Sequence, residues 1–393
     1  MKRRMMWLLF LVLLLSSCSK VPQIPENGVT IPLTTVDFSE IESADMANLF
    51  VYGGRVYVLF DSMDYDGRII GDYLGTVRST IDEWTSREDY QDLNGNIGGD
   101  IYTIPGYDPE FILCQSYPDD ELGIFVCDEG ITFKTGADLL GDRLHLSGQE
   151  KIVLQSYEDW YHSTEQFYRF KEDYQQQTAD FMALLQDAPA IEFSQIPRRE
   201  KSIWHLYCAT AEGIEVHFRL YEGGYVTVDG VNLGFWVEEK AFNRFLKLAS
   251  NPEARELIQM QKNVETEEEC RKEQPLGTYI PAYVPEGTVL SHAEIRYYFN
   301  RGSGELEEVR QLKLEYAGKV FYTVEIGWVY DYESYSNLPP EFIGPFSPEA
   351  IEAQWSETDG GLSLHHYDND FWIAIKGKNL DPQIVYEILT SIA

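Results

Sequence analysis

Short strand-like runs separated by tight turns are the feature that most constrains how this chain can fold. The clearest is Phe50–Val58, in which two β-prone runs flank a Gly-Gly pair that is typical of hairpin turns. Three further runs follow one another at Ile203–Thr210, Ile214–Tyr221 and Tyr225–Val228. Strands joined by such short turns are antiparallel, because a parallel connection needs about a dozen residues or more. The pattern therefore predicts mainly antiparallel sheets.

Helical periodicity is confined to a few segments. Apolar residues recur at helical spacing from Asp173 to Pro189, and a longer pattern runs from Glu238 through Gln261 with Asn251-Pro252 as a break near its middle. The last helix is expected to begin with Asp381 as its N-cap and Pro382 at its first position. We predict an α+β fold that is multi-domain, with predominantly antiparallel sheets and a few packed helices.

Changes in composition divide the chain. A charge-dense stretch with few apolar residues precedes Pro275, and Cys270 within it is expected to be exposed. We predict three separately packed domains, since the length suits two or three of ordinary size. The predicted segments are a signal peptide (1–17), a lipidated tether (18–27), a β-rich domain (28–165), an α+β domain (170–262), an acidic linker (263–275) and an α+β C-terminal domain (276–393).

The N-terminus has the pattern of an export signal. Lys2, Arg3 and Arg4 precede the apolar run Trp7–Leu15, which is far shorter than the roughly 20 residues of a membrane-spanning helix. Leu-Ser-Ser before Cys18 resembles the lipobox of bacterial lipoproteins. The resemblance implies that Cys18 is diacylated and becomes the first mature residue, on the extracytoplasmic face of the cell membrane. An uncleaved N-terminal anchor is the alternative.

The charge of the chain limits its partners. Asp and Glu number 65 against 31 Lys and Arg, for a net charge of −34. Such a polyanion repels phosphate backbones and anionic headgroups, so nucleic acid is not expected and the membrane contact depends on the lipid. With 44% hydrophobic residues the chain is nevertheless expected to fold.

The C-terminal segment contains Tyr283-Val284-Pro285-Glu286-Gly287, a turn at Gly318, Trp355, and the ending from Gly377-Lys378-Asn379-Leu380 through Ser391-Ile392. Together these motifs resemble an uncharacterised domain family of lipoproteins and anti-sigma-like membrane proteins of clostridial and other Gram-positive bacteria. The resemblance implies location and architecture only, because these motifs are structural. The final helix is expected to cover a sheet.

One pair of cysteines can be tested for a disulfide. If Phe111–Cys127 is a hairpin whose turn is centred between Asp120 and Glu121, Cys114 lies directly across from Cys127. A shift of one residue would move one of them to the opposite face. A Cys114–Cys127 bond and two buried thiols are therefore both open.

Two candidate metal sites are weak. In Asp61–Gly67 the register of a calcium loop fails, because the twelfth position would be Tyr73 where a bidentate Glu is required. In His365–Asp370 the adjacent histidines point to opposite faces of a strand. We predict neither a metal nor a cofactor.

Familiar catalytic motifs such as G-x-S-x-G, H-E-x-x-H or a P-loop are not found. We therefore expect a binding or regulatory module for an envelope peptide, glycan or protein. The basic cluster Arg198, Arg199 and Lys201 and the aromatic loop Asp331–Pro348 are candidate contact segments. The favoured alternatives are a solvated loop for the first and a loop packed on its own sheet for the second. The alternative is an envelope enzyme such as a glycan hydrolase, which would show two facing carboxylates with shifted pKa values.

Overall fold

The computed structural model describes residues 22–32, 48–64, 67–82, 84–85, 90–117, 121–196, 202–328, 342, 347–357, 360–366, 371–378 and 380–392. These residues form two compact units. The first unit contains the described residues up to Ile258 together with the turn Arg301–Gly304, and the second contains Gln259–Asn300 and the residues from Glu305 onward.

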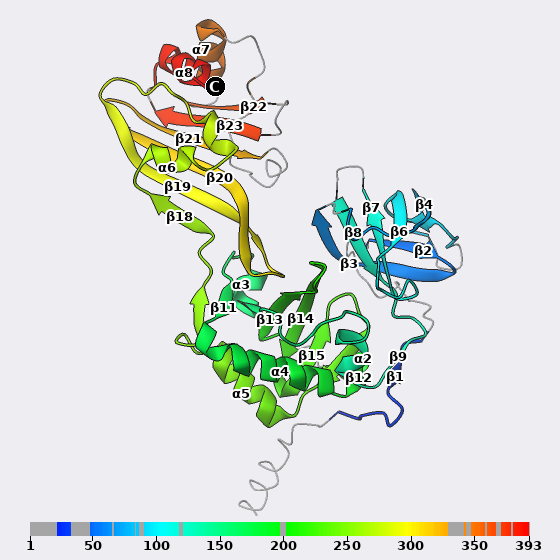
Figure 1. The fold of residues 1–393 in the computed structure, drawn as a ribbon. Coiled ribbons are helices and arrows are strands. Elements are labelled where there is room, and N and C mark those ends of the chain that lie inside the picture. Colours follow the sequence, from blue (N-terminus) through cyan, green and yellow to red (C-terminus); the bar gives the residue numbers. More distant parts are fainter. Residues whose placement is uncertain are drawn as a thin grey trace, which may run out of the picture. The chain divides into compact units, whose positions relative to one another are not determined.

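The N-terminal part of the first unit contains a closed barrel (Figure 1). Its strands, in the order in which they pair, are β2 (Leu49–Tyr52), β3 (Arg55–Asp64), β8 (Glu121–Val126), β7 (Ile112–Ser116), β6 (Gly99–Thr103), β4 (Tyr73–Ser79) and β5 (Asn94–Gly95). Tyr52 lies opposite Arg55, which confirms the predicted hairpin. Gly53 and Gly54 both have positive φ angles, which suit glycine at this turn. Phe50, Tyr57 and Phe125 are among the side chains packed inside.

An eight-stranded antiparallel sheet, which we call the central sheet, forms the rest of the first unit. Its strand order is β12 (Ala190–Glu192), β16 (Leu233–Trp236), β15 (Tyr225–Val228), β14 (Glu215–Tyr221), β13 (Trp204–Ala209), β10 (Val153–Ser156), β11 (Tyr168–Phe170) and β17 (Arg255–Leu257). The three consecutive strands predicted between Ile203 and Val228 are confirmed as β13, β14 and β15. A two-stranded pair, β1 (Val29–Thr30) with β9 (Thr132–Phe133), completes the strands of this unit.

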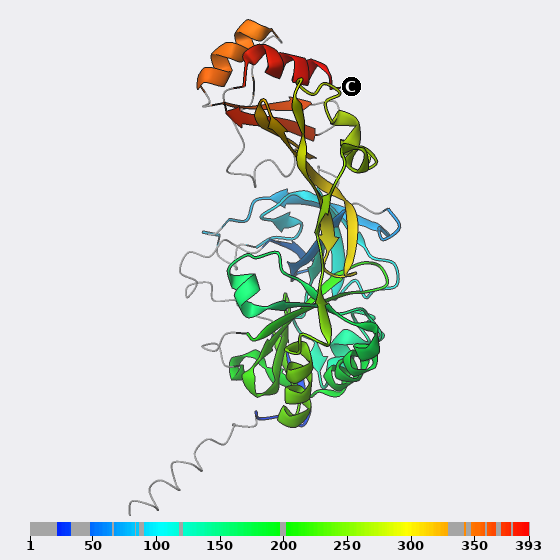
Figure 2. The ribbon, with the colours of Figure 1, turned by 90° about the vertical axis from the view of Figure 1, so that its left-hand side faces the viewer.

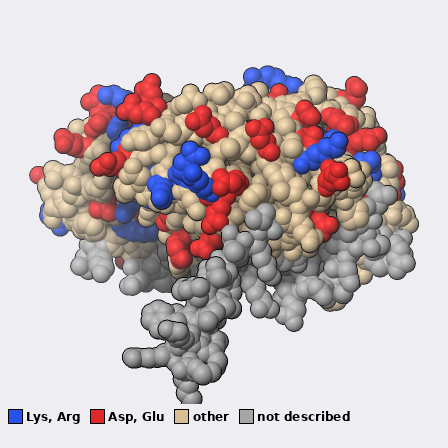
Figure 3. Space-filling view, turned by 90° about the horizontal axis from the view of Figure 1, so that it is seen from below, with Lys and Arg blue, Asp and Glu red and all other residues tan. Residues whose placement is uncertain are grey.

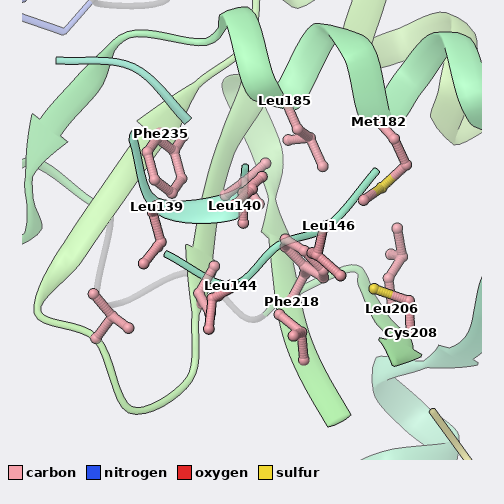
Figure 4. Packing of buried hydrophobic residues seen from close by; sticks show 14 of the residues in the cluster. Leu139, Leu140, Leu144, Leu146, Met182, Leu185, Leu206, Cys208, Phe218 and Phe235 are labelled. Carbon is pink, nitrogen blue, oxygen red and sulfur yellow. The ribbon is translucent and has the colours of Figure 1, made fainter. Parts of the chain in front are cut away.

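Helices α4 and α5 cover one face of the central sheet, as Figures 1 and 2 show. The helices of the unit are α2 (Gly136–Leu140), α3 (Tyr157–Tyr161), α4 (Gln175–Asp187) and α5 (Glu239–Ala249), with short 3-10 turns η3 (Glu172–Tyr174), η4 (Phe193–Gln195) and η5 (Glu222–Gly224). Helices α4 and α5 contact each other through Phe181 and Phe245, whose rings stack 3.7 Å apart. Figure 4 shows Leu139, Leu140, Met182 and Leu185 meeting sheet residues such as Phe218.

The second unit is a six-stranded antiparallel sheet covered by helices. Its strand order is β18 (Gln261–Val264), β19 (Thr288–Asn300), β20 (Glu305–Gly318), β21 (Phe321–Trp328), β23 (Phe371–Lys378) and β22 (Gly361–His366), and its helices are α6 (Glu267–Arg271), η6 (Leu276–Tyr279), α7 (Pro348–Glu357) and α8 (Pro382–Thr390). Figure 2 shows α7 and α8 together beside this sheet. The predicted final helix is confirmed, since Asp381 accepts a hydrogen bond from the Gln383 N–H and Pro382 follows it. The α+β fold class with mainly antiparallel sheets is also confirmed.

The predicted separation of residues 28–165 from 170–262 is wrong. Both segments, the second as far as Ile258, lie in the first unit, where the outer face of the barrel and the central sheet share one hydrophobic core. The residues that join them include Ile124 and Val126 of β8 and Phe218 of β14. The composition change near residue 165 marks a change of secondary structure within one core.

The predicted acidic linker at 263–275 is also wrong. Thr266 and Glu269 form a capping box that starts α6, and this helix buries Cys270, which we expected to be exposed. The preceding strand β18 pairs with β19. The long helical pattern from Glu238 ends earlier than expected, at Ala249, because Pro252 cannot continue it and the chain returns as β17.

The predicted register of the cysteine hairpin is wrong by three residues. Cys114 lies opposite Ile124, because Glu121 already belongs to β8 and not to the turn. An odd shift exchanges the two faces of a strand. Cys114 therefore packs in the large core outside the barrel and Cys127 inside the barrel, and both are free thiols.

Candidate functional site

The strands β13 and β14 alternate between an apolar and a polar face. Leu206 and Phe218 point into the helix-covered core, and so do their neighbours at every second position. His205 and Tyr207 of β13 occupy the intervening positions, and they lie directly opposite Arg219 and His217 of β14. We call the face that carries these four side chains the polar face of the central sheet.

Four side chains on this face form a continuous hydrogen-bonded row, which we call the histidine chain: Ser202, His205, His217 and Asp229. The Ser202 Oγ lies 2.8 Å from His205 Nε2. His205 Nδ1 lies 2.8 Å from His217 Nε2, and His217 Nδ1 lies 2.8 Å from an Asp229 carboxylate oxygen. Every link thus has the length of a direct hydrogen bond.

One choice of tautomers satisfies every link of the histidine chain. If the Ser202 hydroxyl donates to His205 Nε2, the proton of His205 is on Nδ1 and is donated to His217 Nε2. The proton of His217 is then on Nδ1 and is donated to the Asp229 carboxylate. In this arrangement all donors of the row are oriented in the same direction, from the Ser202 hydroxyl to the Asp229 carboxylate.

The electrostatics indicate the protonation states of His205 and Asp229. The pKa of His205 is lowered to about 3, mainly by burial and also by the nearby His217 and Arg219, while Asp229 acts in the opposite direction. Burial acts to raise the pKa of Asp229, but its hydrogen bonds and charge interactions with His217 and Arg219 outweigh this effect and leave the pKa lowered. His205 is consequently neutral and Asp229 ionised at neutral pH.

Aromatic rings and a guanidinium surround the histidine chain. Trp160 of α3 stacks on His205 at 4.8 Å and lies 5.2 Å from the Arg219 guanidinium, while its side chain stays 37% exposed. Arg219 Nη2 donates to Asp229 at 2.6 Å. The Nε–H of the same guanidinium is buried without a hydrogen-bond partner. The polar face thus presents an exposed ring next to an unused donor.

A second group of titratable side chains, the carboxylate pair Asp61 and Glu215, joins β3 to β14. Asp61 accepts a hydrogen bond of 2.7 Å from the backbone N–H of Glu215, and the Glu215 carboxylate lies 3.0 Å from the Arg301 guanidinium. Burial raises the pKa of Asp61 to about 6, against its hydrogen bonds. Burial also raises the pKa of Glu215 to about 7, where Arg301 lowers it and Asp61 adds to the increase.

The residues singled out from the sequence do not converge on one site. Cys18, Arg198, Arg199 and Lys201 lie outside the described residues, as does nearly all of the loop Asp331–Pro348. Asp61 and Ser62 belong to β3, and His365 and His366 to the end of β22. No group of three or more His, Cys, Asp or Glu side chains is placed to hold a metal ion within the part of the chain that the structure describes.

Sequence reasoning missed the histidine chain. His205 occurs in the run IWHLYCAT, which we interpreted only as an apolar strand. The available signal was the alternation in two adjacent strands, since His205 and Tyr207 share one face and His217 and Arg219 share the same face of the next strand. Pairing these strands around the turn near Gly213 would have brought the two histidines together.

Comparisons with known proteins found no family for this chain. No family model, no curated protein and no solved structure matches this chain. The resemblance of its C-terminal motifs to a lipoprotein-associated family stays a prediction. No helix among the described residues is long and apolar enough to cross a membrane.

Proposed function

We propose that this protein is a lipoprotein, anchored through Cys18 to the extracytoplasmic face of the cell membrane, that acts as a binding or regulatory module. Its ligand is an envelope peptide, glycan or protein, and the polar face of the central sheet is the binding surface. The anchor is supported by the export signal before Cys18. The binding surface is supported by the contacts of Arg219.

The unused Nε–H of Arg219 carries the proposal for the binding surface. A buried donor without an acceptor costs about 1–3 kcal/mol, more when the group is charged. Arg219 is held by Asp229 on one side and by the Trp160 ring on another, so its orientation is fixed. A ligand that displaces the atoms covering this Nε–H would supply the missing acceptor oxygen. The proposed ligand therefore brings a hydroxyl or carbonyl oxygen to Arg219.

The neighbouring ring defines the ligand further. The exposed part of Trp160 offers a flat apolar surface beside the donor, as sugar rings and peptide side chains require. Polyanions are not proposed as ligands, because the net charge is −34. On the face that Figure 3 shows, Asp and Glu are interspersed with Lys and Arg, so the excess charge is not gathered there.

Thermal shift with defined ligands tests the binding proposal. The mature protein is heated with soluble peptidoglycan fragments and with short neutral peptides, and a ligand that binds the folded state raises the melting temperature. We expect Trp160→Ala to abolish the shift. Trp84→Ala is the matched control, since Trp84 is 83% exposed and lies outside the polar face. Equal shifts in both variants would exclude this surface.

The anchor is tested separately. Cys18→Ala is expected to accumulate as an unprocessed precursor or to be released into the medium, because the sulfur that carries the lipid is missing. Normal processing and membrane retention of this variant would contradict the lipoprotein proposal.

The alternative of a glycan hydrolase is favoured by one observation, the raised pKa values of Asp61 and Glu215. Such enzymes use one protonated and one ionised carboxyl group. However, the Asp61 carboxylate accepts a hydrogen bond from a backbone N–H, and the Glu215 carboxylate forms an ion pair with Arg301. Release of reducing sugar from cell-wall glycan by the wild type, lost in Glu215→Gln, would favour this alternative over the binding module.

A further inference from the structure

We propose that Ser202 is a nucleophile, activated through the histidine chain, that forms a covalent acyl-enzyme with small neutral acyl esters. This activity goes beyond ligand binding and does not depend on it. The class of substrate follows from the site: the chain is strongly acidic, which disfavours anionic esters, and Ser202 is only 7% exposed, which limits the acyl group to a small one.

Ser202 and His205 are in direct contact, as a nucleophile and its base must be. An activated serine requires a general base within about 2.6–3.2 Å of its oxygen. His205 Nε2 lies 2.8 Å from the Ser202 oxygen, and the tautomer of the histidine chain leaves this nitrogen free to accept the proton. His205 is itself fixed by the Trp160 ring and by His217.

A buried imidazole that resists protonation can still act as a base if it passes on its own proton. When Ser202 gives its proton to His205 Nε2, His205 can pass its Nδ1 proton to His217 Nε2 at 2.8 Å. His205 is then neutral before and after the transfer. The positive charge resides on His217, where the ionised Asp229 balances it at 2.8 Å. A serine triad places this charge on the histidine next to the serine, and here it is moved one imidazole further.

The reaction balances with these groups alone. The Ser202 oxygen attacks the ester carbonyl carbon, and the bond from that carbon to the alkoxy oxygen breaks. The alcohol leaves with the proton from His205 Nε2, while His205 recovers its Nδ1 proton from His217. Water then attacks the acyl-serine through the same path, releases the carboxylic acid and restores the Ser202 hydroxyl. No oxidant, metal or further reactant is needed.

Two other observations agree with a serine nucleophile. Burial raises the pKa of the Cys114 thiol to about 12 and that of the Cys270 thiol to about 11, which disfavours their reactive thiolate forms. Arg219 lies opposite His205 on the polar face, and its Nε–H is a buried donor without a hydrogen-bond partner.

Covalent labelling tests the proposal. The mature protein is incubated with a small alkyl fluorophosphonate and with p-nitrophenyl acetate, and the adduct is located by peptide mass spectrometry. We expect one adduct per chain, on Ser202, and its loss in Ser202→Ala. Ser194→Ala is the matched control, since Ser194 is exposed and its hydroxyl donates a hydrogen bond to the Glu192 carboxylate. An adduct elsewhere, or no adduct on a wild type that melts cooperatively, would overturn the proposal.

The role of the second imidazole has its own readout. His217→Phe and Asp229→Asn are expected to slow labelling by about 10²-fold or more, as removal of general-base assistance does. In mixtures of H2O and D2O the wild-type rate should depend on deuterium content in a curve, because two protons move together. A linear dependence in the wild type, or an unchanged rate in His217→Phe, would overturn the two-imidazole path. Mapping the adduct on the wild type needs no variant, so misfolding of a variant does not affect that test.

Discussion

The histidine chain and the carboxylate pair are both buried polar groups of the first unit, yet they are stabilised in different ways. In the histidine chain each proton has an acceptor, and the terminal charge of Asp229 is matched by Arg219. In the carboxylate pair two acids share one region with Arg301, and burial raises the pKa of both. Burial favours the neutral form of His205 in one cluster and of the two acids in the other. A fall in pH should therefore lower the contribution of the histidine chain to folding stability and raise that of the carboxylate pair.

Proton linkage determines whether each group stabilises or destabilises the folded protein as the pH falls. The pKa of His205 is lowered from 6.5 to about 3 in the folded protein, so the unfolded chain binds a proton first as the pH falls. Its contribution to stability is complete above pH 6.5 and is lost between 6.5 and about 3. The pKa values of Asp61 and Glu215 are raised from 3.8 and 4.5, so the folded protein binds their protons first and gains stability as the pH falls from about 7.

The largest expected effect concerns His205. Its protonation should cost the wild type up to about 1.4 kcal/mol of unfolding free energy per pH unit below 6.5. His205→Phe should lose about 2–3 kcal/mol at pH 7, because Ser202 and His217 lose their buried partner, but should depend less on pH between 6.5 and 4. Urea unfolding at several pH values measures both quantities.

The control for this prediction is His162→Ala, whose histidine side chain is 63% exposed. Its pH profile should run parallel to that of the wild type. If His205→Phe also ran parallel, the neutral state of His205 would be contradicted.

A smaller effect, of opposite sign, is expected for Glu215. Glu215→Gln removes a buried negative charge, so it should stabilise the protein. The expected gain is about 1 kcal/mol at pH 8, after subtraction of the lost contact with Arg301, and it is smaller at pH 5. Thermal melting at the two pH values measures the difference. Glu256→Gln, at a half-exposed ion pair with Arg169, should show no such dependence on pH. Destabilisation by Glu215→Gln that is equal at both pH values would remove the contrast between the two clusters.

The smallest effect concerns Tyr207, which stacks on His217 but does not belong to the histidine chain. Tyr207→Phe removes the hydrogen bond of 2.9 Å from its hydroxyl to Gln155 and should cost about 1 kcal/mol at every pH from 4 to 8. The reason is that burial raises the pKa of this phenol further above that range. A cost that changed with pH would show that the stacked ring is coupled to the titration of the histidines.

Local patterns in the sequence predicted much of the fold. The Gly53-Gly54 hairpin, the strands β13 to β15 and the start of α8 all depend on residues close together in the chain, where turn and cap preferences decide the structure. The barrel and the central sheet share a core through side chains such as Ile124 and Phe218, which are far apart in sequence. No local pattern contains that information.

The candidate site was not predicted for the same reason. The histidine chain depends on the register that places His205 opposite Arg219 and Tyr207 opposite His217. The cysteine hairpin shows how sensitive such reasoning is, since an error of three residues placed Cys114 and Cys127 on one face instead of two. Register depends on packing as well as on turn residues.

The strand order of the barrel fixes a sequence of events for a chain that is delivered N-terminus first. The long strand β3 pairs with β8, whose first residue is Glu121. In the central sheet β11 pairs with β17, which is formed much later in the chain by Arg255–Leu257. Until those segments have emerged, the early strands carry unpaired backbone groups and uncovered apolar side chains, which is the condition that promotes aggregation. The topology therefore predicts that the central sheet is completed only after residue 257 has emerged.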